Sequence, residues 1–187
     1  DTRAGFTAII GAPNAGKSTL VNRLVGSKVS IVTHKVQTTR FPIRGVMMRN
    51  DSQIVLVDTP GIFAPKRRLD RAMVRSAWDG AGDADAIVHL IDARHWTGAG
   101  TLPESAGEYE GPEEDEGIIA RLKEIGAKAI LALNKIDLVE RSALLAAAKT
   151  LFDTGVYSDV VMISGLNGDG VTGASNRSCG TARRWCG

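Results

Sequence analysis

The chain has 187 residues, of which 43% are hydrophobic and 24% charged, and its formal net charge is +2. This length suits one globular domain with a sizeable core, and the composition is that of a globular rather than a disordered chain. A net charge this close to zero does not indicate a nucleic-acid partner, and the lack of any apolar run of about 18 residues excludes a membrane-spanning helix on sequence grounds.

The first predicted element is a short apolar strand, Phe6–Ile10, which leads into the sequence GAPNAGKS at Gly11–Ser18. This is the phosphate-binding P-loop pattern G-x-x-x-x-G-K-S. Thr19–Val25 follows with apolar residues at helical spacing, so the motif lies between a strand and a helix as it should. Its glycines let successive N–H groups point at phosphate oxygens, and the helix N-terminus adds positive charge. Lys17 can contact the β- and γ-phosphates, and the Ser18 hydroxyl can coordinate Mg²⁺.

Two further strands are expected after a long polar segment at residues 27–40, a kind of loop that often moves beside a phosphate site. The segment 41–49 reads as an edge strand and 53–57 as a buried one, joined as an antiparallel hairpin. The buried strand ends in the sequence DTPG. There Asp58 is the expected second Mg²⁺ anchor, acting through water, and the N–H of Gly61 can meet a γ-phosphate. A plain Pro-Gly turn is the alternative explanation.

The middle of the chain mixes regular elements with one polar stretch. A helix is expected at 69–78, after a basic cluster at 66–68 that is either a solvated helix start or a docking surface for RNA or a ribosomal partner. A buried strand at 86–91 ends at an aspartate. The segment 97–117 is acidic and rich in Gly and Pro, so we expect a flexible insertion. A helix is then expected at 118–125.

The second strong motif follows a predicted strand at Ala129–Leu133 and reads Asn-Lys-Ile-Asp. A carboxylate at Asp137 can accept hydrogen bonds from the N1–H and N2 amino groups of guanine. Adenine offers no such pair of donors, and a buried acid left unpaired discriminates strongly against it. Asn134 can brace the surrounding loops, and the stem of Lys135 can cover a base face. Because it follows a P-loop, this motif indicates a site that binds guanine rather than adenine nucleotides.

The C-terminal part should contain a helix at 142–152 and a last strand at 160–163, followed by Ser-Gly-Leu at 164–166. Residues 172–187 show no aliphatic stripe and no helical period, so we expect a disordered tail and a missing final helix. Both cysteines lie in that tail without metal or redox spacing, so no disulfide and a reducing compartment are expected. Asp1 leads directly into the first strand without a signal peptide, which favours the cytoplasm.

The order of these elements predicts an α/β P-loop fold: a mostly parallel six-stranded sheet with one antiparallel edge strand and helices on both faces. The segments GAPNAGKST, QTTR, DTPG, NKID and SGL occur in that order, and through them the chain resembles the translation-factor class of GTPases. VNRLVGSKVSIVTHKVQTTRFPIRGV and DTPGIFAPKRRLDRAMVRSAW are similar to the Era-type GTPases of small-subunit ribosome assembly. The resemblance implies that residues 1–171 are an Era-type G domain, and we expect this sequence to lack the RNA-binding KH domain that usually follows.

What the resemblance implies is a site for GTP or GDP with Mg²⁺. The implied nucleotide ligands are Asn14, Ala15, Gly16, Lys17, Ser18, Thr19, Asp58, Gly61, Asn134, Lys135, Asp137, Ser164, Gly165 and Leu166. The implied metal ligands are Ser18, Thr39 (in preference to Thr38) and Asp58, and the implied catalytic residues are Lys17, Thr39, Gly61 and Asn14.

Two positions bear on rate and affinity. Ile62 stands where Ras-like enzymes carry a water-orienting Gln, and an aliphatic side chain cannot orient water. Relatives without that Gln resemble this chain in having an Asn at position 14, which can hold K⁺ near the phosphates. The resemblance therefore implies slow intrinsic hydrolysis stimulated by K⁺. Relatives usually have Ala at position 165, where Gly can still donate its N–H to guanine O6 but should hold the loop less firmly.

The implied role is a GTP-hydrolysing conformational switch, in which residues 33–40 and 58–70 respond to the γ-phosphate. The implied partners are 16S rRNA and the small ribosomal subunit, in the cytoplasm, with peripheral association at the inner membrane left open. Three alternatives stay open: a truncated guanine-nucleotide-binding module with little turnover, a related GTPase of tRNA modification or large-subunit assembly, and a P-loop kinase acting on a small acceptor.

Overall fold

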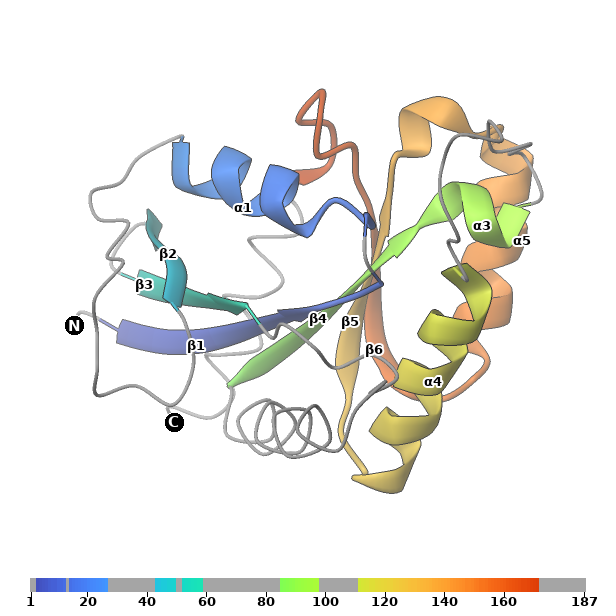
Figure 1. Ribbon diagram of the computed structural model, residues 1–187, viewed down its shortest axis with the longest axis horizontal. Helices are drawn as coiled ribbons and strands as arrows, with labels where there is room; N and C mark the ends of the chain where they lie inside the picture. The colour runs from blue at the N-terminus through green and yellow to red at the C-terminus, as the bar shows by residue number, and fades with distance from the viewer. Residues whose placement is uncertain are drawn as a thin grey trace, which may run out of the picture.

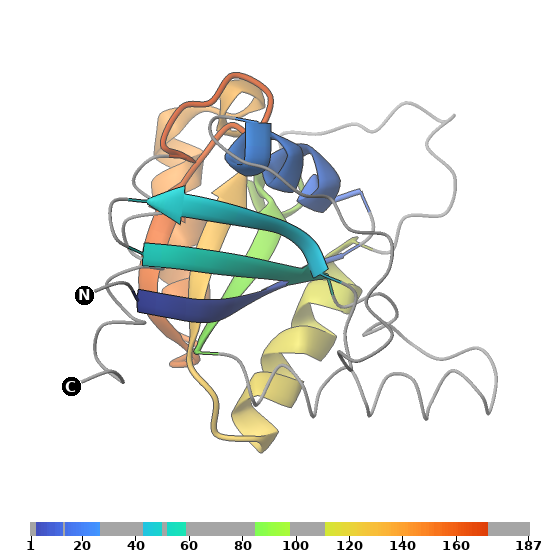
Figure 2. The same cartoon turned by 90° about the vertical axis from the view of Figure 1, so that its left-hand side faces the viewer.

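The computed structural model describes six stretches of the chain, residues 3–12, 14–26, 43–49, 52–58, 85–97 and 111–171. Its centre is a six-stranded sheet in the order β2-β3-β1-β4-β5-β6 (Figure 1). The strands are β1 Arg3–Ile10, β2 Ile43–Arg49, β3 Ser52–Asp58, β4 Ala86–Asp92, β5 Ala129–Asn134 and β6 Tyr157–Met162. Neighbouring strands pair in parallel except β2, which lies antiparallel at the edge beside β3 (Figure 2). The predicted sheet is confirmed.

Helices cover both faces of this sheet (Figure 1). They are α1 Lys17–Gly26, α3 Ala93–Thr97, α4 Gly111–Glu124 and α5 Arg141–Phe152, with a short 3₁₀ helix, η1, at Ile136–Leu138. The helix α1 packs on one face through Leu20 and Val21. The helices α4 and α5 pack on the other through Ile118, Leu122 and Leu151. The predicted arrangement of helices on both faces is therefore confirmed.

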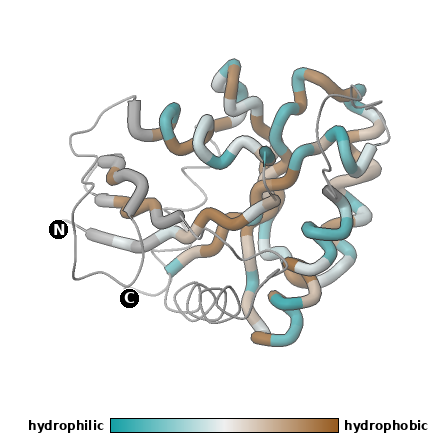
Figure 3. The backbone as a smooth tube through the Cα atoms, in the orientation of Figure 1, coloured by the Kyte–Doolittle hydropathy of each residue, from teal (hydrophilic) through white to brown (hydrophobic). Residues whose placement is uncertain are grey.

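The strands supply apolar side chains to both faces in turn. Ile9 belongs to the core beneath α1, whereas Ala8 and Ile10 belong to the core beneath α4 and α5, as the two-residue period of a strand requires. Every residue of β4 and β5 is buried, which is typical of parallel strands covered on both sides. Figure 3 shows the hydrophobic residues gathered along these central strands.

The residues that could bind a ligand lie at the carboxyl ends of the parallel strands. In register, Ile9 of β1 lies opposite Asp58 of β3, and Asp92 of β4 lies opposite Asn134 of β5. Parallel strands present these ends at one edge of the sheet, where open α/β folds bind their ligands. The sheet thus brings the P-loop and the Asn-Lys-Ile-Asp motif to the same edge.

The structure corrects the two ends of the predicted flexible insertion at residues 97–117, whereas residues 98–110 lie outside the described parts of the chain. Helix α4 begins at Gly111 rather than Ile118, and Thr97 is the last residue of α3. The acidic residues are not merely solvated: Glu113 and Glu114 lie in the first helical turn, where negative charge is favoured by the helix dipole. Asp115 is buried and accepts a hydrogen bond from Trp96 Nε1 at 3.1 Å. For residues 111–117, an acidic composition was therefore a poor guide to flexibility.

Other predictions concern residues outside the described parts of the chain. These are the long loop at 27–40, the helix at 69–78, residues 98–110, and the tail at 172–187 with its missing helix. The short elements α3 and η1 were not predicted, because three to five residues carry too little periodicity. Within the part of the chain that the structure describes, no helix is both long and apolar enough to cross a membrane.

Candidate nucleotide-binding site

The P-loop connects β1 to α1 and needs glycine at both of its ends. A Cβ on Gly11 would collide with the main-chain carbonyl of Leu90 in the neighbouring strand β4. Gly16 has a φ of 99°, and a Cβ there would collide with the side-chain amide of Asn134. Both contacts are too close for any other residue. The two fixed glycines of the motif therefore let the loop pack against β4 and against the second motif.

Inside the loop, Asn14 has a φ of 62°, in the left-handed region that Asn adopts more readily than most residues. Lys17 Nζ lies 2.7 Å from the carbonyl oxygen of Gly11 and 2.9 Å from that of Ala12, so its charge is held over the loop. These contacts fix the lysine where the motif places it.

The first turn of α1 adds main-chain amides next to Lys17. The first bond of α1 runs from Leu20 N–H to the Gly16 carbonyl at 2.9 Å. The amides of Ser18 and Thr19 precede it in the first turn, where a helix has no partner for its N–H groups, and both residues are exposed. The amides, the helix dipole and the lysine together favour a phosphate group.

Asn134 joins the P-loop to the loop after β6. Its side chain is buried, its Nδ2 donates to the Ala15 carbonyl at 2.8 Å, and its Oδ1 accepts from the Gly165 N–H at 2.9 Å. The predicted bracing of the loops by this residue is confirmed. The Gly165 N–H, which the resemblance assigns to guanine O6, bonds here to Asn134 instead.

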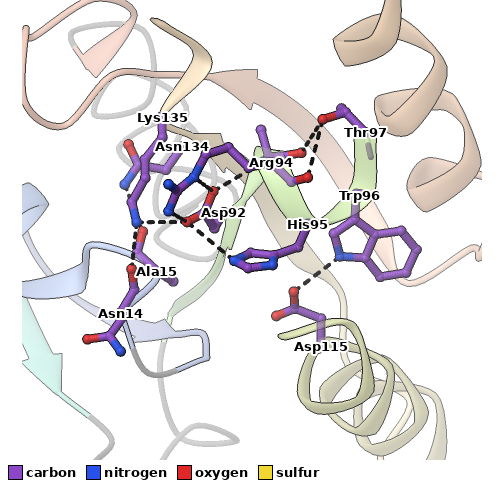
Figure 4. Close-up of polar contacts among 11 residues, drawn as sticks. Asn14, Ala15, Asp92, Arg94, His95, Trp96, Thr97, Asp115, Asn134 and Lys135 are labelled. Carbon is purple, nitrogen blue, oxygen red and sulfur yellow. Dashed lines mark hydrogen bonds and ion pairs between the residues drawn. The ribbon is translucent and has the colours of Figure 1, made fainter. Parts of the chain in front are cut away.

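Lys135 connects the same motif to a different part of the P-loop. Its backbone has a φ of 63°, and its Nζ lies 2.9 Å from the Asn14 carbonyl and 2.7 Å from Asp92 Oδ2 (Figure 4). A lysine ammonium has three donors and no acceptor, so two of them are already directed at fixed oxygens. The sequence offered no reason to connect Lys135 with Asp92.

The Asp92 carboxylate is the buried acceptor at the centre of this contact. Arg94 donates to Oδ2 from Nη2 at 2.7 Å, and to Oδ1 from both Nε and its own backbone N–H at 3.1 Å (Figure 4). Burial by itself raises the pKa of Asp92, but the hydrogen bonds from Arg94 and Lys135 outweigh it and hold the pKa below its usual value. Asp92 is therefore ionised at neutral pH. His95 Nε2 lies 3.6 Å from Oδ2, and burial lowers the pKa of that imidazole.

The remaining residues of the base-binding prediction lie on η1 and on the loop after β6. Asp137 is exposed on η1, and the Ile136 N–H bonds to the Ile163 carbonyl at 3.4 Å, which ties this turn to the end of β6. Ser164 is buried, and its Oγ accepts from the Asn167 N–H at 3.1 Å. Leu166 is 70% exposed. The Asp137 turn and the loop at 164–166 are thus held next to each other by main-chain bonds.

Arg23 is a further residue of the site that motif analysis missed. From α1 its Nε donates to the Gly165 carbonyl at 2.8 Å, and its terminal nitrogen donates to the Leu166 carbonyl. Gly168 leaves room for this guanidinium, since a Cβ there would lie 2.8 Å from Arg23 Nη1. A basic residue on the exposed face of a helix gives no sequence signal, because its partners lie 142 and 143 residues away.

Comparison with known proteins decides the family. The sequence model of the family described as 50S ribosome-binding GTPase matches residues 6–135. The chain belongs to this family.

Among its relatives, GTPase Era of Caulobacter vibrioides is 64% identical over 170 residues, which are 91% of this chain and 54% of that protein. GTPase Era of Maricaulis maris is 57% identical over 173 residues, again covering 54% of its length. A solved structure of Era in complex with MgGDPNP and nucleotides 1506-1542 of 16S ribosomal RNA superposes with a TM-score of 0.70 at 33% identity, covering 95% of this chain and 56% of that one. The chain therefore spans about half the length of these relatives.

In this member of the 50S ribosome-binding GTPase family, the structure brings the two ends of the predicted site together. Asn134 and Lys135 both contact the P-loop, and Gly165 contacts Asn134. The backbone of Asp58 lies at the same edge of the sheet. Thr39 and Gly61 lie outside the described residues, so their place in the site stays a prediction.

Proposed function

We propose that residues 1–171 of this chain are the nucleotide-binding domain of an Era-type GTPase, which binds GTP and GDP and hydrolyses GTP slowly as a conformational switch. The observation that carries the proposal is the Asn134 side chain, which bonds to the P-loop at Ala15 and to the second loop at Gly165. A nucleotide has its phosphates at one end and its base at the other. A single buried amide that bonds to both loops fixes the spacing between those ends. The 64% identity with a GTPase Era supports the same conclusion.

At the phosphate end, the proposed ligands are the P-loop residues from Asn14 to Thr19, with Gly61 toward the γ-phosphate. Lys17, held over the loop by two carbonyl oxygens, would stabilise the charge that develops on the transferred phosphoryl group. Ser18, Thr39 and Asp58 are the proposed Mg²⁺ ligands, and their oxygen atoms are the donors that this hard cation prefers. When bound, Mg²⁺ would supply neutralisation of charge between the β- and γ-phosphates.

At the base end, Asp137 is proposed to select guanine, with Lys135 and the loop at 164–166 completing the pocket. We expect GTP to bind at least about 100-fold more tightly than ATP, because a site built to accept two hydrogen bonds rejects a base that cannot donate them. Asp137→Asn should weaken GTP binding and shift the preference toward xanthosine triphosphate. Competition binding with the three nucleotides measures this, with the exposed Asp153→Asn as matched control. Equal competition by ATP would favour a P-loop kinase instead.

Hydrolysis is proposed to be stimulated by K⁺ held at the Asn14 side chain. Because Asn14 has a left-handed φ of 62°, glycine is the variant that removes the side chain without straining the loop. Asn14→Gly should bind GTP normally but lose the difference between rates measured in K⁺ and in Na⁺. A K⁺ response that survives this change would remove Asn14 from the mechanism. A single-turnover assay, which detects one round of phosphate release, separates a slow enzyme from a module that only binds.

The proposed partners are 16S rRNA and the small ribosomal subunit. The support is the high identity with proteins named GTPase Era, and the similarity to an Era structure that contains 16S ribosomal RNA. The 16S ribosomal RNA in that Era complex favours small-subunit assembly over tRNA modification or large-subunit assembly. Co-sedimentation of the full-length protein with purified 30S subunits, with GTP or with GDP, tests the partner. Fractionation of cells tests the proposed cytoplasmic location and any peripheral association with the inner membrane.

A further inference from the structure

Asp92 belongs to none of the nucleotide-binding motifs, yet its carboxylate accepts four hydrogen bonds at the edge of the site. It is the last residue of β4, and its side chain is only 1% exposed. Three of the bonds come from Arg94 and one from Lys135. Both carboxylate oxygens are thus satisfied, and the charge has two cationic partners, as a buried carboxylate requires.

The contact with Lys135 reaches into the nucleotide site. Lys135 Nζ lies between Asp92 Oδ2 at 2.7 Å and the carbonyl oxygen of Asn14 at 2.9 Å (Figure 4). Asn14 is the P-loop residue with a left-handed backbone. The lysine therefore links the end of β4 to the strained part of the P-loop, and the carboxylate fixes one end of that link. Without it, a long side chain with four rotatable bonds would have a single neutral acceptor to hold it.

Arg94 gives the carboxylate its orientation. Its Nε and Nη2 each bond to a different oxygen, in the bidentate arrangement that fixes the plane of a carboxylate. The side chains of Arg94 and Lys135 are each 26% exposed, whereas Asp92 is shielded from water. The aspartate is thus the rigid member of the group, and Lys135 is the member that it positions.

We propose that Asp92 is a positioning residue for the guanine nucleotide: it holds Lys135 against the P-loop carbonyl of Asn14, so that the base-binding motif and the phosphate-binding loop keep one fixed geometry. This rests on the proposed function, in which Lys135 and Asp137 bind the base. Asp92 itself does not touch the nucleotide. Its effect on binding passes through Lys135, which distinguishes this role from a general contribution to folding.

A double-mutant cycle tests the role, with the release of a fluorescent GDP analogue as the readout. Asp92→Asn should speed release about tenfold, the effect of losing one charge-assisted hydrogen bond. In a Lys135→Ala background the same change should alter release by less than about twofold, because the residue through which it acts is gone. Equal acceleration in both backgrounds, or no acceleration in either, would overturn the proposal.

Two further variants distinguish a positioning role of Asp92 from a contribution to folding alone. Arg94→Ala leaves the Asp92–Lys135 pair in place, so it should speed release less than Asp92→Asn does; an equal effect would mean that Asp92 only anchors the start of α3 and would overturn the proposal. The exposed Asp153→Asn should leave release unchanged. If Asp92→Asn does not fold, Asp92→Ala, which removes the carboxylate without burying an amide, goes through the same cycle with the same criteria.

The experiments distinguish a failure of the proposed function from a failure of the positioning role. A chain that does not bind GDP, or whose binding ignores Asp137→Asn, defeats the guanine site and this proposal together. A chain whose GDP binding depends on Asp137 but does not respond to Asp92→Asn defeats the positioning role alone.

Discussion

The two ends of the proposed site are built in different ways. The P-loop takes its shape from its own backbone: glycines at 11 and 16, a left-handed Asn14, and a lysine that bonds to carbonyls five and six residues away. The base end depends more on side chains, and the contacts that join it to the P-loop and α1 link residues 119 to 143 positions apart. A local arrangement can be read from a short motif, but a long-range one needs the fold before its partners are known.

The contrast between the two ends is tested most directly at Gly16, where the P-loop meets the side chain of Asn134. Gly16→Ala places a Cβ against the Asn134 amide at a φ of 99°, and positive φ alone costs about 1–3 kcal/mol. We expect GDP affinity to fall by more than about 100-fold, measured by calorimetry. Gly117→Ala is the control, since a Cβ there meets nothing within 4 Å. An unchanged affinity for Gly16→Ala would show that the loops do not need this contact.

Removing the side chain that bridges the loops should have the next largest effect. Asn134→Ala leaves the Ala15 carbonyl and the Gly165 N–H without their partner, at about 1–3 kcal/mol for each buried group. We expect GDP to bind at least about tenfold more weakly, with a lower melting temperature. Asn167→Ala, at an exposed position of the neighbouring loop, should change neither. If only the melting temperature falls, the bridge serves stability and not the site.

A smaller effect is expected at Arg23, which holds the base loop from α1. Arg23→Ala removes the bonds to the Gly165 and Leu166 carbonyls, and we expect GDP release to be about fivefold faster. Arg23→Lys should recover only part of this, because an ammonium lacks the fork that reaches two carbonyls. Stopped-flow release measures both variants. Full recovery by lysine would mean that charge alone matters.

The smallest expected effect is on the stability of the fold at acid pH. The folded state lowers the pKa of Asp92 below its value in the unfolded chain, because the bonds from Arg94 and Lys135 outweigh burial. A depressed carboxyl pKa contributes stability that is full above the unfolded pKa, about 4, and is lost as the pH falls through the folded pKa. The stability gap between wild type and Asp92→Asn should therefore narrow below about pH 4, as urea denaturation at several pH values would show. A gap independent of pH would contradict this sign.

The same contrast explains what could be predicted from sequence. The strands follow from local periodicity, and the fold class follows from the order of the predicted elements. The P-loop and its helix follow from a motif that carries its own geometry. The brace at Asn134 was predicted because its motif is short and specific. Asp92 and Arg23 were not, because an acid at a strand end and a base on a helix are common and gain meaning only from partners elsewhere in the chain.

The first turns of α4 were mispredicted for a related reason. Acidic residues between Gly and Pro indicate solvent exposure on composition alone, but Asp115 turns inward to Trp96, and its Oδ1 lies 3.3 Å from His89 Nε2. Composition averages over a window, whereas one buried side chain with two partners can fix a helix start. The two histidine contacts show that polar groups tie β4 to its neighbouring helices: His89 of β4 contacts Asp115 of α4, and His95 of α3 contacts Asp92 of β4.

The strand order has a consequence for solubility. Among the strands that the structure describes, β2 and β6 are at the margins of the sheet, and β1, β3, β4 and β5 have a neighbour on each side. The ladder of β2 is interrupted between Ile43 and Gly45, and an irregular ladder is a poor template for a strand from another molecule. The other margin, β6, leads into the proposed base-binding loop at 164–166, so intermolecular strand pairing there would begin beside the site.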